Sequence, residues 1–181
     1  ESTLIVLTSD HGDYLGDHWL GEKDLFHEPS VRVPLVICDP SALANGTRGH
    51  VVEEFVEAID VLPTLVEFAG GTVPLERIEG RSLLPFVHQK DGGLSWRDCA
   101  ISEIDFSDRG PRTLLDVHPY ECRSRMIKTT KWKYIFHEHF PPQLFDLEND
   151  PHEFIDLGED PGYRAVRQEN YDRLFTWFRG L

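Results

Sequence analysis

The feature that most constrains the fold is a β-branched apolar run near the start of the chain that ends abruptly in a polar turn. The run is Thr3-Leu4-Ile5-Val6-Leu7-Thr8, and Ser9-Asp10-His11-Gly12 follow it directly. Such a run, bounded by turn residues, is typical of a buried strand, here over residues 3–9. A chain that opens inside a core strand is expected to be part of a longer polypeptide.

Further elements in the first half of the chain predict the class of fold. A second β-branched run spans Val31–Cys38, with Pro34 favouring a bend or an edge position. Asp60 is placed to cap a helix that ends at Gly70-Gly71. Strands that alternate with a helix predict an α/β layer with a mainly parallel sheet. Residues 10–30 lack an apolar period, so we expect a long functional or disordered loop there.

The second half of the chain has a different pattern. Short strands are predicted at Arg123–Lys128, Trp132–His137 and Gln143–Leu147, which together suggest an antiparallel meander. Apolar residues at helical spacing then predict an amphipathic helix over Tyr163–Arg179. We therefore expect an α/β chain that ends in a small antiparallel sheet subdomain and a terminal helix, with domains at 1–98 and 99–181.

The composition excludes several classes of partner. The chain has 18 basic and 32 acidic residues and a net charge of −14, which argues against nucleic acid as a partner. No apolar run approaches the roughly 20 residues that span a bilayer, so no membrane partner is expected. Its three cysteines lack paired spacing, which excludes a disulfide framework and favours the cytoplasm. The sequence does not indicate an oligomeric state.

The chemistry is concentrated in Asp10 and His11, which follow the first predicted strand. Ligands of open α/β sheets bind beyond the carboxyl ends of strands, where a carboxylate and an imidazole could share a divalent cation. Alternatively, Asp10 caps a turn and His11 is an ordinary surface histidine. Lys23, twelve residues later, could neutralise a tetrahedral oxyanion or simply be exposed. His18 and His27 could orient a ligand, protonate a leaving group or lie on the surface.

These residues, in this order, resemble the sulfatase and phosphonate monoester hydrolase branch of the alkaline phosphatase superfamily. The similar stretches are Thr8–His18, Gly21-Glu22-Lys23 and Ser30–Ile37. Downstream segments also resemble that family, and they are Asp60–Leu65 with Ala69-Gly70, Glu79–Leu84, Lys131–Tyr134, Gln143–Leu147 and Asn149-Asp150-Pro151. The resemblance covers most of the chain and implies that its first half is part of an alkaline-phosphatase-like sheet.

The resemblance also implies an activity and a set of site residues. Enzymes of this kind hydrolyse small anionic esters, here a sulfuric ester (an aryl or alkyl sulfate) or a phosphonate or phosphate monoester. Carried over by position, Asp10 and His11 would bind one divalent metal ion, Ca²⁺ or Mn²⁺. Lys23 would be the catalytic contact to the substrate oxyanion or to the leaving-group oxygen.

The sequence departs from the family pattern at the nucleophile. Formylglycine-type enzymes carry Cys-x-Pro-x-Arg early in the chain, together with two further acidic ligands. The nearest string here, Cys38-Asp39-Pro40-Ser41-Ala42, has Ala in place of the Arg and follows the metal pair, so Cys38 is expected only to end a buried strand. The chain then corresponds to the C-terminal third of an enzyme. We expect it to be inactive without the missing N-terminal part of the same protein.

Two other hypotheses remain. The chain could be a non-catalytic sulfatase-like scaffold that binds a partner or an anion through the basic strands of residues 123–133 or the Trp132 region. It could also be an autonomous cation-binding module. The basic residues themselves are expected to form one solvated face of a strand pair or a rim that recruits anions; they are Arg123, Arg125, Lys128, Lys131 and Lys133.

Overall fold

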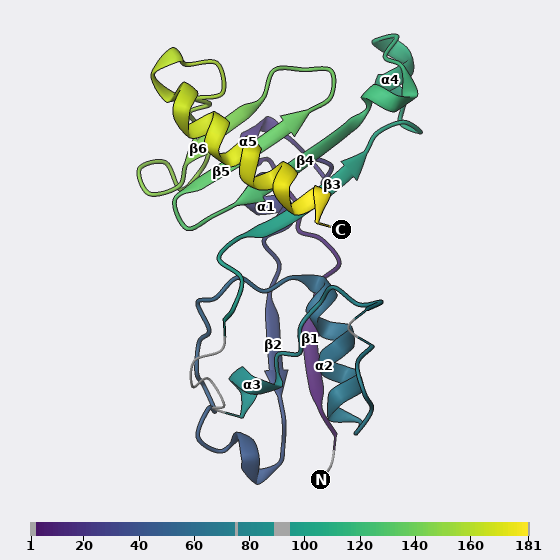
Figure 1. Ribbon diagram of the computed structural model, residues 1–181, viewed down its shortest axis with the longest axis vertical. Helices are drawn as coiled ribbons and strands as arrows, with labels where there is room; N and C mark the ends of the chain where they lie inside the picture. The colour runs from purple at the N-terminus through teal and green to yellow at the C-terminus, as the bar shows by residue number, and fades with distance from the viewer. Residues whose placement is uncertain (1–2, 75, 89–94, 181) are drawn as a thin grey trace. The chain divides into compact units, whose positions relative to one another are not determined.

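The computed structural model describes residues 3–74, 76–88 and 95–180, and it packs the chain into two compact units (Figure 1). The first unit comprises Glu1–Gly12 and Arg32–Asp98, and the second comprises Asp13–Val31 and Cys99–Leu181. The second unit therefore combines an early segment of the chain with the C-terminal residues. The assignment of 1–98 and 99–181 as domains remains a prediction.

The first unit is built on two paired strands. Strand β1 (Ile5–Thr8) pairs with β2 (Leu35–Cys38) in antiparallel fashion, with Ile5 opposite Cys38 and Thr8 opposite Leu35. The expected parallel arrangement is wrong for this pair. A parallel pair needs a crossover, which is usually a long helix. The connection here contains only two short helical elements, η1 (Asp17–Trp19) and α1 (Glu28–Val31).

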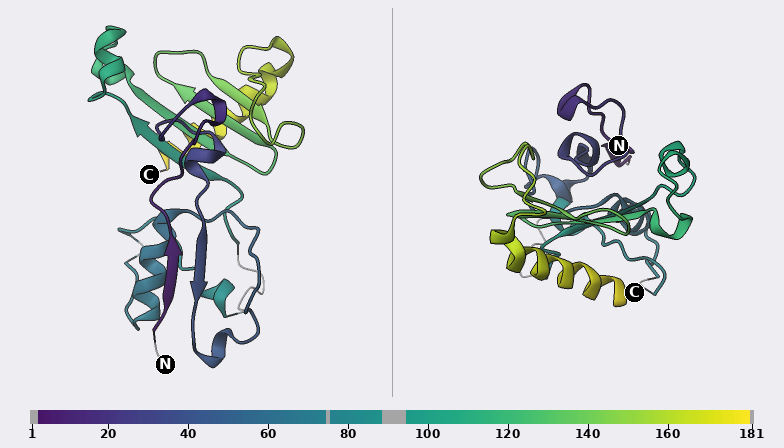
Figure 2. Two further views of the ribbon diagram at one scale, coloured as in Figure 1. Left: turned by 180° about the vertical axis from the view of Figure 1, so that it is seen from behind. Right: turned by 90° about the horizontal axis from the view of Figure 1, so that it is seen from above.

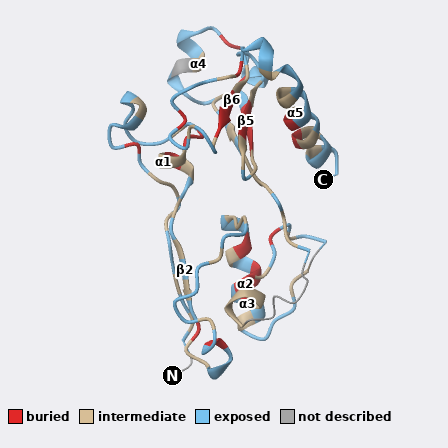
Figure 3. Cartoon of the chain, turned by 90° about the vertical axis from the view of Figure 1, so that its left-hand side faces the viewer, coloured by how far each residue is buried: buried red, intermediate tan, exposed pale blue. Residues whose placement is uncertain are grey.

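The two strands of this pair are buried on one face only. Ile5 and Leu7 are exposed while Val6 is half-buried, and Leu35 and Ile37 are half-buried while Val36 is exposed (Figure 3). Successive side chains of a strand point to opposite faces, so this alternation means that one face meets solvent. The expectation that Cys38 ends a buried strand is half right, because Cys38 is the last residue of β2 but is exposed.

Short helical elements complete the first unit. They are η2 (Ala42–Ala44), η3 (Ala58–Asp60), α2 (Val61–Phe68) and α3 (Leu84–Val87). Helix α2 begins after Asp60 as predicted, but the Asp60 side chain makes no capping hydrogen bond to it. Gly70, with φ of 78°, follows the end of α2, and glycine adopts this left-handed conformation without steric cost.

The second unit contains a four-stranded antiparallel sheet in the order β3-β4-β5-β6. The strands are β3 (Ala100–Asp105), β4 (Arg123–Lys128), β5 (Trp132–His137) and β6 (Gln143–Asp146). The meander of the last three confirms the prediction, whereas β3 was not predicted. The other elements are α4 (Gly110–Leu114), η4 (Pro119–Glu121), η5 (Pro161–Tyr163) and α5 (Arg164–Arg179). Among the described helices, none is both long enough and apolar enough to cross a bilayer.

Different parts of the chain cover the two faces of this sheet. Helix α5 packs on one face of the sheet (Figure 2). It covers Ile127, Tyr134 and Leu144, and Leu174 of the helix is fully buried against them. The segment of residues 13–31 covers the other face, where Phe26 packs against Met126, Ile135 and Phe145. The predicted packed face of Trp132, Tyr134 and Phe136 is confirmed, since all three belong to the α5 side.

The basic residues of β4 and β5 do not form the solvated face that we predicted. Arg125 is buried on the α5 side, and Lys133, which is 0% exposed, lies on the opposite side. Each of the five cations pairs with a carboxylate; the pairs are Arg123–Asp105, Arg125–Glu103, Lys128–Glu28, Lys131–Glu148 and Lys133–Glu28. Strand alternation places these cations on opposite faces of the sheet, and carboxylates of the same chain pair with each of them. This pairing gives no support to an anion-recruiting rim or to a scaffold function that depends on one.

Candidate metal and ester site

Asp10 and His11 lie together where β1 ends. The Ser9 hydroxyl donates to the His11 carbonyl at 2.7 Å, and the His11 backbone N–H donates to Asp10 Oδ1 at 3.1 Å. These local bonds turn the chain so that His11 Nε2 lies 3.4 Å from Asp10 Oδ2. The Asp10 side chain is 84% exposed and that of His11 is 39% exposed. The turn therefore presents a carboxylate and an imidazole side by side at the surface.

The other ring nitrogen of His11 fixes the tautomer. Nδ1 lies 2.7 Å from the carbonyl oxygen of Gly12, and a carbonyl can only accept a hydrogen bond. Nδ1 therefore carries the proton, and in the neutral imidazole the lone pair is on Nε2, the nitrogen that faces Asp10. Metal-binding histidines usually donate their second ring N–H to a carbonyl or carboxylate in this way.

A carboxylate oxygen of Asp10 and a ring nitrogen of His11 are both atom types that bind divalent cations. Two neighbouring ligands in an octahedral shell are about 3 Å apart, because metal–ligand distances of about 2–2.5 Å meet at roughly right angles. The separation of 3.4 Å between Asp10 Oδ2 and His11 Nε2 is close to that value. Within the described ranges, no group of three or more His, Cys, Asp or Glu side chains is placed to hold a metal. The pair thus offers two donors, and a full coordination shell needs more.

Lys23 belongs to the second unit, in the segment between η1 and α1, and is exposed. A network of buried ions anchors this segment to the sheet. Lys133 Nζ, on β5, contacts Glu28 Oε1 and the Phe26 carbonyl, each at 2.7 Å, and also pairs with Glu153. Burial opposes the ionisation of Glu28, but the nearby ammonium groups of Lys133 and Lys128 outweigh it and lower the pKa of Glu28. Lys23 therefore lies in a segment held by charge pairs far apart in the sequence.

His18 and His27 pack together within this segment. Their rings stack with centroids 4.1 Å apart, and His27 Nδ1 lies 2.8 Å from the Tyr14 hydroxyl. Burial, together with the nearby His18 and Lys133, lowers the pKa of His27 to about 4. Burial raises the pKa of Tyr14 to about 12, so the phenol beside His27 keeps its proton. The surface position that was one expectation for His27 is wrong, because this histidine is part of the core.

Comparison with known proteins places the chain in a family. A family model described as "N-sulphoglucosamine sulphohydrolase, C-terminal" matches residues 16–178. The chain belongs to this family. It is 39% identical over 180 residues to the multifunctional alkaline phosphatase superfamily protein PehA of Trinickia caryophylli, covering 98% of the chain and 34% of that protein. It is 36% identical over 165 residues to the choline-sulfatase of Rhizobium meliloti, covering 89% of the chain and 28% of that protein.

Solved structures of this sulfatase and phosphonate monoester hydrolase group have the same fold. The phosphonate monoester hydrolase of Agrobacterium radiobacter superposes with a TM-score of 0.86 at 36% identity, over 96% of the chain and 34% of that protein. The chain thus spans about a third of the length of the relatives it matches. It is a C-terminal domain of sulfatase and phosphonate monoester hydrolase type, and the predicted family is confirmed.

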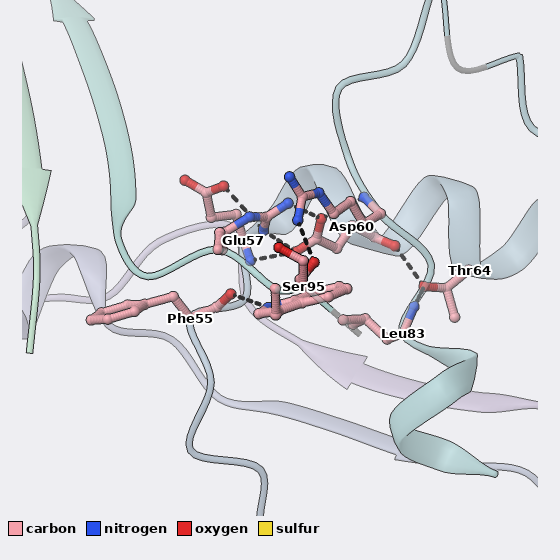
Figure 4. A network of polar contacts seen from close by, with 9 residues as sticks. Phe55, Glu57, Asp60, Thr64, Leu83 and Ser95 are labelled. Carbon is pink, nitrogen blue, oxygen red and sulfur yellow. Dashed lines mark hydrogen bonds and ion pairs between the residues drawn. The ribbon is translucent and has the colours of Figure 1, made fainter. Parts of the chain in front are cut away.

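Two other stretches that resemble the family have a structural role. The Asp60 carboxylate, 0% exposed, accepts hydrogen bonds from the backbone N–H groups of Glu57 and Arg81, each at 2.8 Å, and pairs with the Arg97 guanidinium (Figure 4). Gly80 is required beside it, because a Cβ there would lie 2.0 Å from the Ile59 carbonyl oxygen. Sequence reasoning missed Arg97, which lies 37 residues from Asp60 in a region without a recognisable motif.

The string Cys38–Ala42 also has a structural explanation. The Asp39 carboxylate is buried and lies 2.6 Å from His88 Nε2, and it accepts a hydrogen bond from the Ser41 backbone N–H at 2.7 Å. The carboxylate is thus occupied by a turn and by a histidine from the end of α3. That Cys38 is not a family-type nucleophile stays a prediction.

Proposed function

We propose that this chain supplies the metal ligands Asp10 and His11 and the substrate contact Lys23 to a metal-dependent hydrolase of sulfate or phosphonate esters. The observation that carries the proposal is the strand-end geometry, in which His11 Nδ1 is anchored to Gly12 and Nε2 faces the Asp10 carboxylate. Relatives named as an arylsulfatase and a choline-sulfatase, and the solved phosphonate monoester hydrolase, support this class of reaction.

The residues have separate roles in this proposal. Asp10 and His11 would hold one divalent ion, Ca²⁺ or Mn²⁺, whose bound form supplies a Lewis acid for the ester oxygen. The hydrogen bond to Gly12 keeps the ring of His11 in the tautomer that can bind a metal. The ammonium group of Lys23 would neutralise charge that develops on a non-bridging or leaving-group oxygen. The remaining donors and the nucleophile would come from the rest of the enzyme, so this chain alone would show no turnover. The free cysteines favour a cytoplasmic location.

The test uses the full-length enzyme that contains this chain. Asp10→Ala and His11→Ala are expected to abolish metal-dependent hydrolysis, and Lys23→Ala to lower kcat by about 10²–10³. The matched controls are Asp172→Ala at an exposed position on α5 and Lys131→Ala at a half-buried position in the β4–β5 turn, and both should keep activity.

Metal addition provides the second part of the test. Chelation should remove activity, and titration with Ca²⁺ and Mn²⁺ should show which ion restores it. Unchanged turnover in Asp10→Ala or His11→Ala would reject the ligand assignment, and unchanged turnover in Lys23→Ala would reject its contact with the substrate.

A further inference from the structure

A cavity of about 490 Å³ lies in the second unit, beside the segment that carries Lys23. Its wall includes Asp24 and Leu25, the two residues that follow Lys23, together with the β3–β4 connection and the loop after β5. Consecutive Cα atoms are about 3.8 Å apart, so Lys23 is next to the wall of this cavity. We call it the α4 cavity, because α4 forms part of it. Its volume is within the range of roughly 300–1,000 Å³ that is typical of sites for small organic molecules.

The lining of the α4 cavity is mainly apolar. Leu25, Phe106, Leu115, Val117 and Phe140 all contribute side chains to it. Leu115 is 59% exposed and Phe140 is 50% exposed. Neither residue belongs to the two described hydrophobic clusters of the sheet. Binding of an apolar ligand would remove this apolar surface from water, which is favourable.

The guanidinium groups around the α4 cavity are not equivalent. Arg109 Nη2 pairs with Asp24 at 3.3 Å, and Arg123 Nε pairs with Asp105 at 3.2 Å. Arg112 has no carboxylate partner among the described residues. Its Nη1 makes only a long 3.5 Å hydrogen bond to the Val117 carbonyl, and its Nε is buried without a hydrogen-bond partner in the described part of the chain. A guanidinium that lacks a carboxylate partner keeps donor capacity at its Nη atoms, where an anionic ligand can form charge-assisted hydrogen bonds.

We propose that the α4 cavity binds the organic group of the ester, specifically an aromatic group that carries a carboxylate, and that Arg112 pairs with this carboxylate. The proposal rests on the proposed function, because Lys23 at the ester would place the organic group beside Asp24 and Leu25. The apolar wall would take the ring, and the one cavity guanidinium that lacks a carboxylate partner in the described residues would select the anionic substituent.

The binding test uses the full chain and 6-hydroxy-2-naphthoate, which contains no ester. Titration calorimetry should show saturable binding that is at least tenfold tighter than binding of the uncharged 2-naphthol. Arg112→Met keeps an apolar side chain of similar length but removes the guanidinium, and it should abolish this preference. Gly110→Phe should prevent binding of both ligands by filling the cavity, since a Cβ on Gly110 meets no atom within 4 Å. Arg164→Met, on exposed α5 surface outside the cavity lining, is the matched control.

The outcomes of this test are decisive. Absence of naphthoate binding by the unmodified chain overturns the proposal. A preference for the carboxylate that survives Arg112→Met also overturns it, as does full binding by Gly110→Phe with an unchanged melting temperature. Loss of the preference in Arg112→Met alone, with Arg164→Met behaving as the unmodified chain, supports the pairing.

Kinetics of the full-length enzyme separate this proposal from the proposed function. The substrates are the 6-carboxy-2-naphthyl and methyl esters of sulfate and of methylphosphonate. Arg112→Met should lower kcat/KM at least tenfold for the naphthyl esters and leave the methyl esters unchanged. If the unmodified enzyme hydrolyses none of the esters while naphthoate binding stands, the proposed function fails. If hydrolysis stands and Arg112→Met leaves the ratio unchanged, only the role of the α4 cavity fails.

Discussion

Two aspartates of the first unit occupy stretches that resemble the same family, and the structure gives them opposite environments. Asp60 is fully buried, and each of its carboxylate oxygens accepts two hydrogen bonds from protein N–H groups. Asp10 lies at the end of β1 with 84% of its side chain exposed. A carboxylate whose lone pairs are all used by the protein can only hold the fold together. One that faces solvent beside an imidazole retains capacity for a ligand.

The same contrast separates two histidines. His27 is buried, bonded to Tyr14 and stacked on His18, and burial favours its neutral form. His11 is part-exposed, and only its Nδ1 is tied to the backbone, at Gly12. Resemblance to a family motif therefore does not by itself show that a residue is a ligand, and we use the saturation of its polar atoms by protein groups as a second criterion to be tested.

The largest expected effect is the loss of the buried carboxylate. Asp60→Ala should lower the free energy of unfolding by about 3–5 kcal/mol, because the largely buried guanidinium of Arg97 would lose its principal partner. Urea denaturation followed by tryptophan fluorescence measures this change. Asp172→Ala, a change of the same type at an exposed site on α5, should stay within about 0.5 kcal/mol of the unmodified chain. A loss below about 1 kcal/mol in Asp60→Ala would mean that saturation does not indicate structural importance.

The next effect concerns pH and the buried histidine. Because the pKa of His27 is lowered to about 4 from an ordinary value of 6.5, the unfolded chain takes up this proton first as the pH falls. The contribution of neutral His27 to the free energy of unfolding is therefore retained above pH 6.5 and is lost as the pH falls toward 4. The expected loss is about 2 kcal/mol between pH 7 and pH 5.

Comparison with His27→Gln isolates this contribution. Burial also lowers the pKa of His137, but His137 titrates in both proteins and cancels from the difference. Urea midpoints at several pH values should decline less steeply for His27→Gln than for the unmodified chain. Equal slopes would show that His27 is not held neutral by its surroundings.

The sequence predicted those parts of the molecule that depend on local periodicity. The bounds of β4 and β5 matched the prediction, and the terminal helix began one residue later than expected, because strand alternation and helical spacing are local signals. The Asp10-His11 pair was located at a strand end for the same reason. Strand β3 escaped prediction because polar residues interrupt its short apolar pattern.

Features that depend on distant partners could not be predicted. The segment of residues 13–31 packs with the second unit through contacts such as Lys133 to Glu28, which are 105 residues apart. The five basic residues looked like one solvated patch because the sequence does not show that each meets its own carboxylate. Likewise, no local pattern connects Asp60 with Arg97, so the structural role of Asp60 could not be predicted from the sequence.

A smaller effect tests the hydrogen bond between Tyr14 and His27. Tyr14→Phe keeps the ring but removes the hydroxyl that lies 2.8 Å from His27 Nδ1. Leaving that buried nitrogen without its hydrogen-bond partner should cost about 1–2 kcal/mol. Thermal unfolding at pH 7.5 measures the change, and Tyr120→Phe, at an exposed position, is the matched control. No change in Tyr14→Phe would indicate that His27 is satisfied by another group.

The smallest stability effect is expected for Asp10→Asn, which tests the exposed aspartate of the comparison with Asp60. The substitution keeps the shape of the side chain but removes its charge, and an exposed residue that contributes little to the fold should change the unfolding free energy by less than about 0.5 kcal/mol. The same variant in the full-length enzyme should lose more than about a hundredfold in kcat/KM, because even partners of metal ligands cost 10–100-fold when changed. A destabilised chain with normal turnover would place Asp10 in the same class as Asp60. A stable chain with lost turnover would show that the solvent-facing carboxylate is kept for the metal.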